Sequence, residues 1–237
     1  LALPGAQVDG HDYAARAAAA GAAAVLAARP VGVPAVVVKP AGRTDSNADI
    51  YAHDADGSAK AVVDALAALA HAVVARLPEL TVVGITGSAG KTSTKDLVAS
   101  VLRMAGETVA PPGSFNNEIG HPYTALRCDY GTRFLVAEMS ARGIGHIAHL
   151  AESVPPKIGA VLNVGSAHLG EFGSRENIAR AKGELVEALP ADGVAVLNAD
   201  DPFVAAMASR TRARVVSYSA HGRADLWADD IRLDDVA

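Results

Sequence analysis

The sequence has little of three things: cysteine, basic charge and long apolar runs. Its single cysteine, Cys128, cannot form an internal disulfide, so the fold does not depend on an oxidising compartment. There are 21 lysine and arginine residues against 26 aspartate and glutamate residues, and the net charge is -5. This balance argues against a nucleic-acid-binding scaffold and against a protein that binds membranes through a polybasic surface. The most apolar stretch, 17–28, is too short for a transmembrane segment, which takes roughly 20 apolar residues.

Apolar residues are nevertheless plentiful enough for a large core. They make up 50% of the 237 residues, and only 20% of the residues are charged, which is typical of a globular chain. The length allows one large domain or two modest ones. The chain begins at Leu1 without an initiator methionine, and we expect it to be part of a longer protein.

The first part of the chain has the pattern of a small α/β domain. An alanine-rich helical stretch follows Asp12, and the short apolar runs 23–26 and 35–38 are typical of buried strands. The segment 39–57 has no clear period and is predicted to be a surface loop.

A helix is predicted to end this domain, because Ser58 can cap its start and Pro78 stops it at about Leu77. Beyond it, β-branched and apolar runs alternate with helical segments, which indicates a parallel sheet. The predicted fold class is therefore α/β, with a smaller α/β domain at 1–78 followed by a P-loop-type central domain, built on a mostly parallel sheet, at 79–237. Its strands are expected at 81–86, 108–110, 133–138, 158–164, 194–198 and 214–218.

The first of these strands runs into a glycine turn and then a helix, which is the order of a phosphate-binding loop. Gly87 and Gly90 let backbone amides face a phosphate, and Lys91 can reach the terminal phosphates. Thr92 offers a hydroxyl to magnesium. The form is G-x-x-G-K-T, since Ile85 stands where the commoner loop has its first glycine. The nucleotide-binding residues are predicted to be Thr86, Gly87, Ser88, Ala89, Gly90, Lys91, Thr92 and Ser93.

Two further polar residues follow strands, and ligands of parallel sheets bind beyond the carboxyl ends of strands. Glu138 ends the third strand, where a P-loop enzyme needs a second anionic metal ligand. The alternative is a solvated glutamate at a strand end. His168 lies in a glycine-rich turn after the next strand. A lone histidine is more often structural, but this position favours a ligand or catalytic role.

Lys182 is the least expected residue, because it lies on the inward stripe of a helix that starts near Ser174. It follows Ile178 by four residues and precedes Leu185 by three. Either its stem packs while the ammonium reaches water, or the amine is partly desolvated, has a lowered pKa and is reactive. The segment 198–202 after the next strand carries either ligand groups or an Asx turn that caps a short helix.

Five segments together resemble the Mur ligase family. They are 86–92 (TGSAGKT), 113–122 (GSFNNEIGHP), 138–139 (EM), 163–169 (NVGSAHL) and 198–202 (NADDP). The asparagine pair in GSFNNEIGHP points to the branch that joins D-alanyl-D-alanine to UDP-N-acetylmuramoyl-tripeptide in peptidoglycan precursor synthesis. The start of the chain, 1–12, resembles the family's domain for the UDP end of the substrate. Folate polyglutamate ligases share the ATPase core but lack that domain.

The resemblance implies an ATP-dependent amide-bond-forming ligase that is cytoplasmic and monomeric, with ATP and magnesium as cofactors. Lys91 and the loop amides would hold the ATP phosphates. Thr92 and Glu138 would bind one magnesium ion, and His168 would bind a second. Lys182 matches the family's lysine that takes up carbon dioxide to become a carbamate, so Lys91, His168 and Lys182 are the expected catalytic residues.

The resemblance also implies where the two substrates bind and how they react. Asn198 would lie near the adenine, and Asn116 and Asn117 near the muramoyl peptide. The substrate's terminal carboxylate attacks the γ-phosphate, and the amine of D-alanyl-D-alanine then attacks the acyl phosphate. No enzyme nucleophile is required, which suits a site that relies on alignment and charge neutralisation.

The chain departs from the family at both ends. By the resemblance, we expect the sequence to lack an Asp-Ser-Arg segment for uridine binding ahead of Leu1, and to lack the rest of the ATPase domain and the carboxyl-terminal Rossmann-like domain after Ala237. We therefore expect the chain to be inactive by itself. The alternatives are another Mur-type ligase, a P-loop phosphotransferase, or a nucleotide-binding module without catalysis. The last is disfavoured by four intact residues, Lys91, Thr92, Glu138 and His168.

Overall fold

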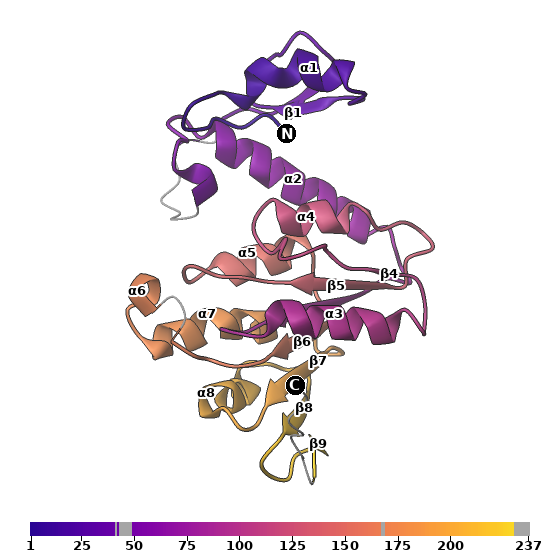
Figure 1. The fold of residues 1–237 in the computed structure, drawn as a ribbon, viewed down its shortest axis with the longest axis vertical. Helices are drawn as coiled ribbons and strands as arrows, with labels where there is room; N and C mark the ends of the chain where they lie inside the picture. The colour runs from indigo at the N-terminus through magenta and orange to yellow at the C-terminus, as the bar shows by residue number, and fades with distance from the viewer. Residues whose placement is uncertain (41, 43–48, 167–168, 230–237) are drawn as a thin grey trace, which may run out of the picture. The chain divides into compact units, whose positions relative to one another are not determined.

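The protein divides into two compact units, Leu1–Ala70 and His71–Ala237 (Figure 1). The computed structural model describes residues 1–40, 42, 49–166 and 169–229. The chain passes from the first unit to the second within one helix, α2 (Ser58–Val74). The predicted division into domains at Pro78 stays a prediction.

The first unit is a small α/β layer. A 3-10 turn, Gly10–Tyr13, leads into α1 (Ala14–Ala19). The strands β1 (Val25–Ala27) and β2 (Ala35–Val37) pair in parallel. Small apolar side chains form its core, with Ala2, Ala14, Val25 and Ala27 buried.

Three predictions for this unit need correction. The strand β1 is buried as expected, but β2 is not: Val36 is 57% exposed and Val37 is 48% exposed. Residues 49–51 of the expected loop form a 3-10 turn, Asp49–Tyr51, while 41 and 43–48 lie outside the described residues. Ser58 does not cap α2. Asp54 does, since its carboxylate accepts from the first-turn amides of Ala59 and Lys60, each at 2.9 Å.

The second unit is built on a seven-stranded parallel sheet, which confirms the predicted α/β class. Its strands lie in the order β4-β5-β3-β6-β7-β8-β9. Their bounds are Thr81–Thr86 (β3), Thr108–Val109 (β4), Phe134–Glu138 (β5), Ile158–Val161 (β6), Val194–Asn198 (β7), Arg214–Ser219 (β8) and Leu226–Trp227 (β9). The last was not predicted.

Helices connect the strands from β3 to β8, as is usual in a parallel sheet, and the loop 220–225 joins β8 to β9. The bounds of the helices are Lys91–Leu102 (α3), Gly120–Ala125 (α4), His146–Ser153 (α5), Leu169–Phe172 (α6), Arg175–Glu187 (α7) and Pro202–Ala205 (α8), and a 3-10 turn, Ala206–Arg210, follows the last. Ser174 caps α7 by accepting from the Asn177 amide at 3.2 Å. The helix therefore begins where the sequence predicts.

Alternate residues of each central strand face different helices, because side chains of a strand point to opposite faces. Val83 and Ile85 pack with Ala99 of α3 in one core cluster. Between them, Gly84 faces α7, where an added Cβ would lie 3.0 Å from Leu185 Cδ1. The sheet is thus covered by α3 on one face and by α7 on the other, and both helices begin at or near the carboxyl ends of the strands.

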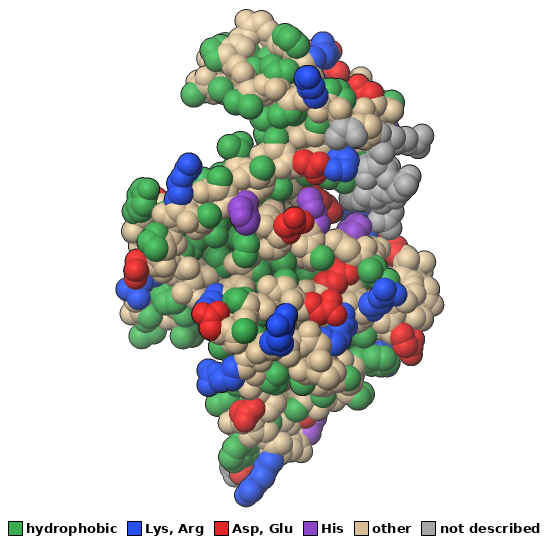
Figure 2. All heavy atoms as spheres, turned by 180° about the vertical axis from the view of Figure 1, so that it is seen from behind, with side chains coloured by type: hydrophobic (Ala, Val, Ile, Leu, Met, Phe, Trp, Pro, Cys, Tyr) green, Lys and Arg blue, Asp and Glu red, His purple; other side chains and the backbone are tan. Residues whose placement is uncertain are grey.

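The surface carries charges of both signs. On the face drawn in Figure 2, Lys and Arg side chains are interspersed with Asp and Glu. Among the described residues, no helix is both long enough and apolar enough to cross a membrane.

Leu185 is expected to be the side chain on which the packing of α7 depends most. It is fully buried and fills the space above Gly84 and Gly159. Leu185→Ala should lower the free energy of unfolding by about 2–5 kcal/mol, since it leaves a cavity between helix and sheet. Leu97→Ala on α3 is the control, because Leu97 is 70% exposed and its loss should change stability by less than about 0.5 kcal/mol. Urea unfolding measures both, and equal effects would contradict this packing.

Candidate functional site

The predicted phosphate-binding loop lies between β3 and α3. Gly87 has no room for a side chain, because a Cβ there would lie 2.9 Å from Leu162 Cβ. Gly90 immediately precedes α3 with φ +81°, a left-handed conformation that favours glycine. The Lys91 ammonium donates to the Gly87 carbonyl at 3.0 Å, which closes the loop on itself. Both glycines are therefore required by the shape of the turn.

The loop is held from outside by Asn163, which follows β6. The Ser88 amide donates to the Asn163 carbonyl at 3.0 Å, and the Ala89 amide donates to Asn163 Oδ1 at 2.9 Å. Ser88 Oγ in turn accepts from the Gly165 amide at 2.9 Å. Two of the predicted phosphate-binding amides are thus already used, and the amides of the first turn of α3 remain for a phosphate, since they have no partner within the helix.

The two ends of the predicted nucleotide segment differ in burial. Thr86 is fully buried, and its hydroxyl has no hydrogen-bond partner within the described part of the chain. Ser93 is exposed in the first turn of α3. The segment therefore runs from the core to the surface within one turn, and Lys91 and Thr92 lie between these extremes.

Glu138 is the centre of the site. It ends β5 beside β3, is 1% exposed, and accepts from Thr92 Oγ1 at 2.9 Å. Asn116 Nδ2 donates to its other oxygen at 2.6 Å. Hydroxyl and carboxylate oxygens are the ligands that magnesium takes in proteins, together with phosphates and water. The donor set of Thr92 and Glu138 therefore fits the predicted ion.

The two predicted substrate residues lie in different surroundings. Asn116 contacts Glu138, so it belongs to the same cluster as the expected metal ligands. Asn117 is exposed, and its Oδ1 accepts from the Gly120 amide at 2.9 Å at the start of α4. A contact of either side chain with the muramoyl peptide stays a prediction.

His168 lies outside the described residues, so its predicted role at a second magnesium stays a prediction. Within the described ranges, no three His, Cys, Asp or Glu side chains gather in a way that could hold a metal ion by themselves. The Thr92 and Glu138 pair would therefore need phosphate or water oxygens to complete a coordination shell.

Lys182 is buried on the inward face of α7, as its spacing predicts. It is 5% exposed and lies between Ile178 and Leu185, which are 1% and 0% exposed. Burial disfavours the ammonium and, with the positive charge of Lys91 nearby, lowers the pKa of Lys182 to about 8. The structure thus brings Lys182 into the electrostatic range of the phosphate-binding loop. Of the two interpretations left open, the burial and the lowered pKa agree with the desolvated amine, and its reactivity stays a prediction.

The segment after β7 is an Asx turn, the second of its two interpretations. Asp201 caps α8 by accepting from the Phe203 amide at 2.9 Å, and its Oδ2 accepts from the Val164 amide at 2.7 Å. Asn198 donates through Nδ2 to the Leu162 carbonyl at 2.9 Å. The predicted adenine contact of Asn198 stays a prediction, and its side chain already joins β7 to β6.

Sequence reasoning missed two residues. Asn163 belongs to the NVGSAHL motif, but a side chain that hydrogen-bonds to the backbone of another loop follows no recognisable spacing in the sequence. Lys95 on α3 is fully buried, and it lies four residues before the buried Ala99. That inward spacing is the signal that singled out Lys182, and it could have found Lys95.

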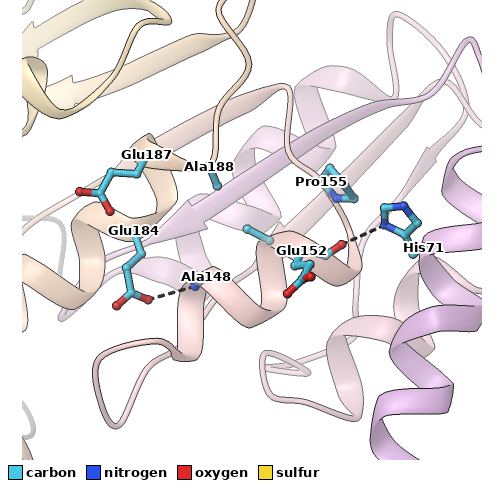
Figure 3. Close-up of a pocket in the computed structure, with 8 residues that line it drawn as sticks. His71, Ala148, Glu152, Pro155, Glu184, Glu187 and Ala188 are labelled. Carbon is cyan, nitrogen blue, oxygen red and sulfur yellow. Dashed lines mark hydrogen bonds between the residues drawn. The ribbon is translucent and has the colours of Figure 1, made fainter.

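An open pocket of about 470 Å³ lies on the second unit beside α5 and α7 (Figure 3). Glu184 points toward the start of α5, where it accepts from the Gly145 and Ala148 amides at 2.6 and 3.0 Å. His71 Nδ1 donates to the Glu152 carbonyl at 2.9 Å. None of the predicted site residues lines this pocket, whose lining is His71, Ala148, Ala151, Glu152, Pro155, Glu184, Glu187 and Ala188.

In the first unit, the segment that resembles a UDP-binding domain forms a polar network. Asp9 accepts from His11 Nδ1 at 2.6 Å and from Arg29 at 3.0 Å, and His11 Nε2 accepts from the Ala28 amide. Burial by itself raises the pKa of Asp9, but the hydrogen bonds from His11 and Arg29 outweigh it and lower the pKa to about 2. These contacts hold the unit together, and a role toward UDP stays a prediction.

The lowered pKa of Lys182 can be tested without substrates. Competitive acetylation of amines by acetic anhydride, read by mass spectrometry, should give half-maximal reactivity of Lys182 at about pH 8, because the neutral form accumulates above that pH. The control is Lys157, a lysine at the surface, whose side chain is 42% exposed and pairs with Asp192. Lys91→Met should move the Lys182 midpoint upward, since a like charge is removed. A Lys182 midpoint equal to that of Lys157 would contradict the burial of its amine.

Comparisons with known proteins place the chain in a family. Residues 85–236 match the Mur ligase middle domain, and residues 1–74 match the Mur ligase family, catalytic domain. The UDP-N-acetylmuramoyl-tripeptide–D-alanyl-D-alanine ligase of Mycobacterium tuberculosis is 62% identical over 239 residues, which cover 100% of this chain and 47% of that protein.

Solved structures give the same relationship. A crystal structure of MurF from Acinetobacter baumannii has a TM-score of 0.80 and 31% identity, covering 98% of this chain and 47% of that chain. MurF ligase from Thermotoga maritima in complex with ADP has a TM-score of 0.72 and 34% identity, covering 93% of this chain and 47% of that chain. The chain spans about half the length of these relatives. It belongs to the Mur ligase family.

Proposed function

We propose that the protein containing this chain is an ATP-dependent ligase that joins D-alanyl-D-alanine to UDP-N-acetylmuramoyl-tripeptide in peptidoglycan precursor synthesis. The observation that carries the proposal is the contact of Thr92 with Glu138, which joins the phosphate-binding helix to the neighbouring strand end. The names of the relatives from Mycobacterium tuberculosis and Acinetobacter baumannii supply the choice of substrates. Binding of ADP by the Thermotoga maritima relative supports ATP as the nucleotide.

The proposed reaction needs alignment and neutralisation of charge. The terminal carboxylate of the tripeptide attacks the γ-phosphorus of ATP, and ADP leaves. The amine of the dipeptide then attacks the acyl carbon, and phosphate leaves as the amide forms. Lys91 neutralises negative charge on the transferred phosphoryl group, and the amides at the start of α3 orient the phosphates. No side chain of the protein becomes bonded to substrate.

Magnesium, when bound, would supply positive charge that offsets the negative charge of the phosphates. Thr92 and Glu138 would hold one ion through their side-chain oxygens, and we assign His168 to a second. The Asn116 amide keeps one carboxylate oxygen of Glu138 in place, so the other is oriented toward Thr92. Glu138 is thus oriented before any ligand arrives.

Lys182 is proposed to react with carbon dioxide, which forms an N–C bond and releases a proton to give a carbamate. Only the neutral amine reacts, and burial makes that form common near neutral pH because it lowers the pKa to about 8. The change replaces a cation beside Lys91 by an anion, so a repulsion becomes an attraction. The new carboxylate would help to position magnesium.

The remaining assignments concern the protein as a whole. We assign the UDP end of the substrate to the first unit, the muramoyl peptide to the loop with Asn116 and Asn117, and the adenine to the neighbourhood of Asn198. We further assign action as a monomer, as the resemblance to the family implies. Nucleotide-linked substrates support a cytoplasmic location.

The reaction type is tested with the full-length enzyme, ATP labelled in its γ-phosphate, magnesium and UDP-N-acetylmuramoyl-tripeptide. Adding D-alanyl-D-alanine should release the label as free phosphate in step with ADP and amide product. Omitting the dipeptide should nearly abolish turnover. Label retained in a stable phosphorylated product would instead indicate a P-loop phosphotransferase and would overturn the proposal.

The carbamate is tested by Lys182→Ala in the same enzyme. Activity should fall by about 100-fold or more, since an anion near the metal is lost. Short-chain carboxylic acids should restore part of it by occupying the space of the missing carbamate. Lys157→Ala, at an exposed lysine, should keep full activity. Unchanged activity of Lys182→Ala would reduce Lys182 to a packing role.

A further inference from the structure

Lys95 is a fully buried lysine that the proposed mechanism does not use. It lies on α3, four residues after Lys91. Its Nζ donates to the carbonyls of Pro111 at 2.6 Å and Gly113 at 2.9 Å, and it pairs with Asp96 Oδ1 at 2.9 Å. A lysine ammonium has three N–H groups, so these three acceptors use all of them. The Lys95 ammonium therefore has a protein acceptor for each of its N–H groups and does not need water.

The two carbonyls belong to the segment between β4 and α4, which is irregular in structure. This segment also carries Asn116, whose side chain donates to Glu138 and whose carbonyl accepts from the Ser140 amide at 3.2 Å. Gly113 has φ +60°, a left-handed conformation that turns the chain between Pro111, which Lys95 binds, and Asn116, which binds Glu138. Lys95 thus fixes the start of the segment, and Asn116 fixes its middle.

These contacts form a closed ring through the candidate site. Thr92 of α3 donates to Glu138, Glu138 accepts from Asn116, and the segment leads back to Lys95 of the same helix. Thr92 and Lys95 are three residues apart, which is nearly one helical turn. Any displacement of the segment relative to α3 must therefore break a contact of Lys95 or move Asn116 on Glu138.

We propose that Lys95 is a positioning residue that holds Asn116 on Glu138 and so couples the 110–119 segment to the nucleotide site. The inference rests on the proposed function for its catalytic consequence, but not for its structural one. Within this ring Lys95 makes no hydrogen bond to Thr92 or Glu138. It therefore acts on them through the backbone of the segment. Loss of its ammonium should loosen the segment and weaken the orientation of Glu138.

The test compares Lys95→Met with Lys157→Met in the full-length enzyme. Methionine keeps an unbranched side chain of similar length but removes all three donors. Hydrogen exchange of the Ser140, Gly120 and His121 amides, which donate to Asn116 and Asn117, should rise by about tenfold in Lys95→Met, with β3 and β5 still protected, because the segment loses its charged hydrogen bonds. The magnesium concentration for half-maximal activity should rise by a similar factor, while kcat at saturating magnesium changes less. Lys157→Met should change neither, and unchanged exchange in Lys95→Met would overturn the proposal.

A double variant separates positioning from general stability. If Lys95 acts through Asn116, then Lys95→Met should add little to the magnesium requirement of Asn116→Ala. Effects that multiply would show that Lys95 acts by another route and would contradict the proposal. The exchange measurement needs no substrate, so it tests the anchoring of the segment whether or not the enzyme is a ligase. A wild-type enzyme without ligase activity would refute the proposed function alone.

If Lys95→Met does not fold, Lys95→Arg takes its place. Arginine keeps the charge, but its donors are spread over a planar fork and cannot reproduce three bonds from one nitrogen. Exchange of the Ser140, Gly120 and His121 amides and the magnesium requirement should both rise, by less than tenfold. An arginine variant in which both stay at wild-type values would overturn the proposal.

Discussion

The site depends on one buried carboxylate. Glu138 is 1% exposed, and its two oxygens accept from Thr92 and Asn116. A carboxylate removed from water is unfavourable unless it is hydrogen-bonded, so both partners must be delivered to the end of β5. Thr92 comes with the first turn of α3 and Asn116 with the segment after β4. The same carboxylate therefore fixes the positions of two otherwise separate parts of the site.

The sheet explains how distant segments reach this point. Because all its strands are parallel, β3, β5, β6 and β7 end at one edge, where the loop at Gly87, Glu138, Asn163 and Asn198 follow them. From opposite faces, α3 and α7 bring Lys91 and Lys182 to that edge. The positive charge of Lys91 acts on Lys182, so α3 and α7 bring two like charges near each other. An anion bound or formed between them would reduce this repulsion. This electrostatic strain favours phosphate and supports the proposed carbamate.

Much of this could be predicted from the sequence. Alternating strands and helices gave the parallel sheet, and inward spacing identified Lys182. What failed depends on backbone contacts that side-chain patterns do not encode. Asp54, not Ser58, caps α2 because a loop folds its carboxylate back onto the first turn. Lys95 escaped notice because its partners are carbonyls of an irregular segment, although its inward position is as clear as that of Lys182.

The central claim is that Glu138 and Thr92 together form the metal site beside the phosphate-binding loop. The most direct measurement is anomalous diffraction from crystals of the full-length enzyme with manganese and a non-hydrolysable ATP analogue. The account predicts an anomalous peak at about 2.1 Å from Thr92 Oγ1, with a Glu138 oxygen bound to it directly or through water. A peak away from both residues, with the Thr92 and Glu138 hydrogen bond still intact, would contradict it.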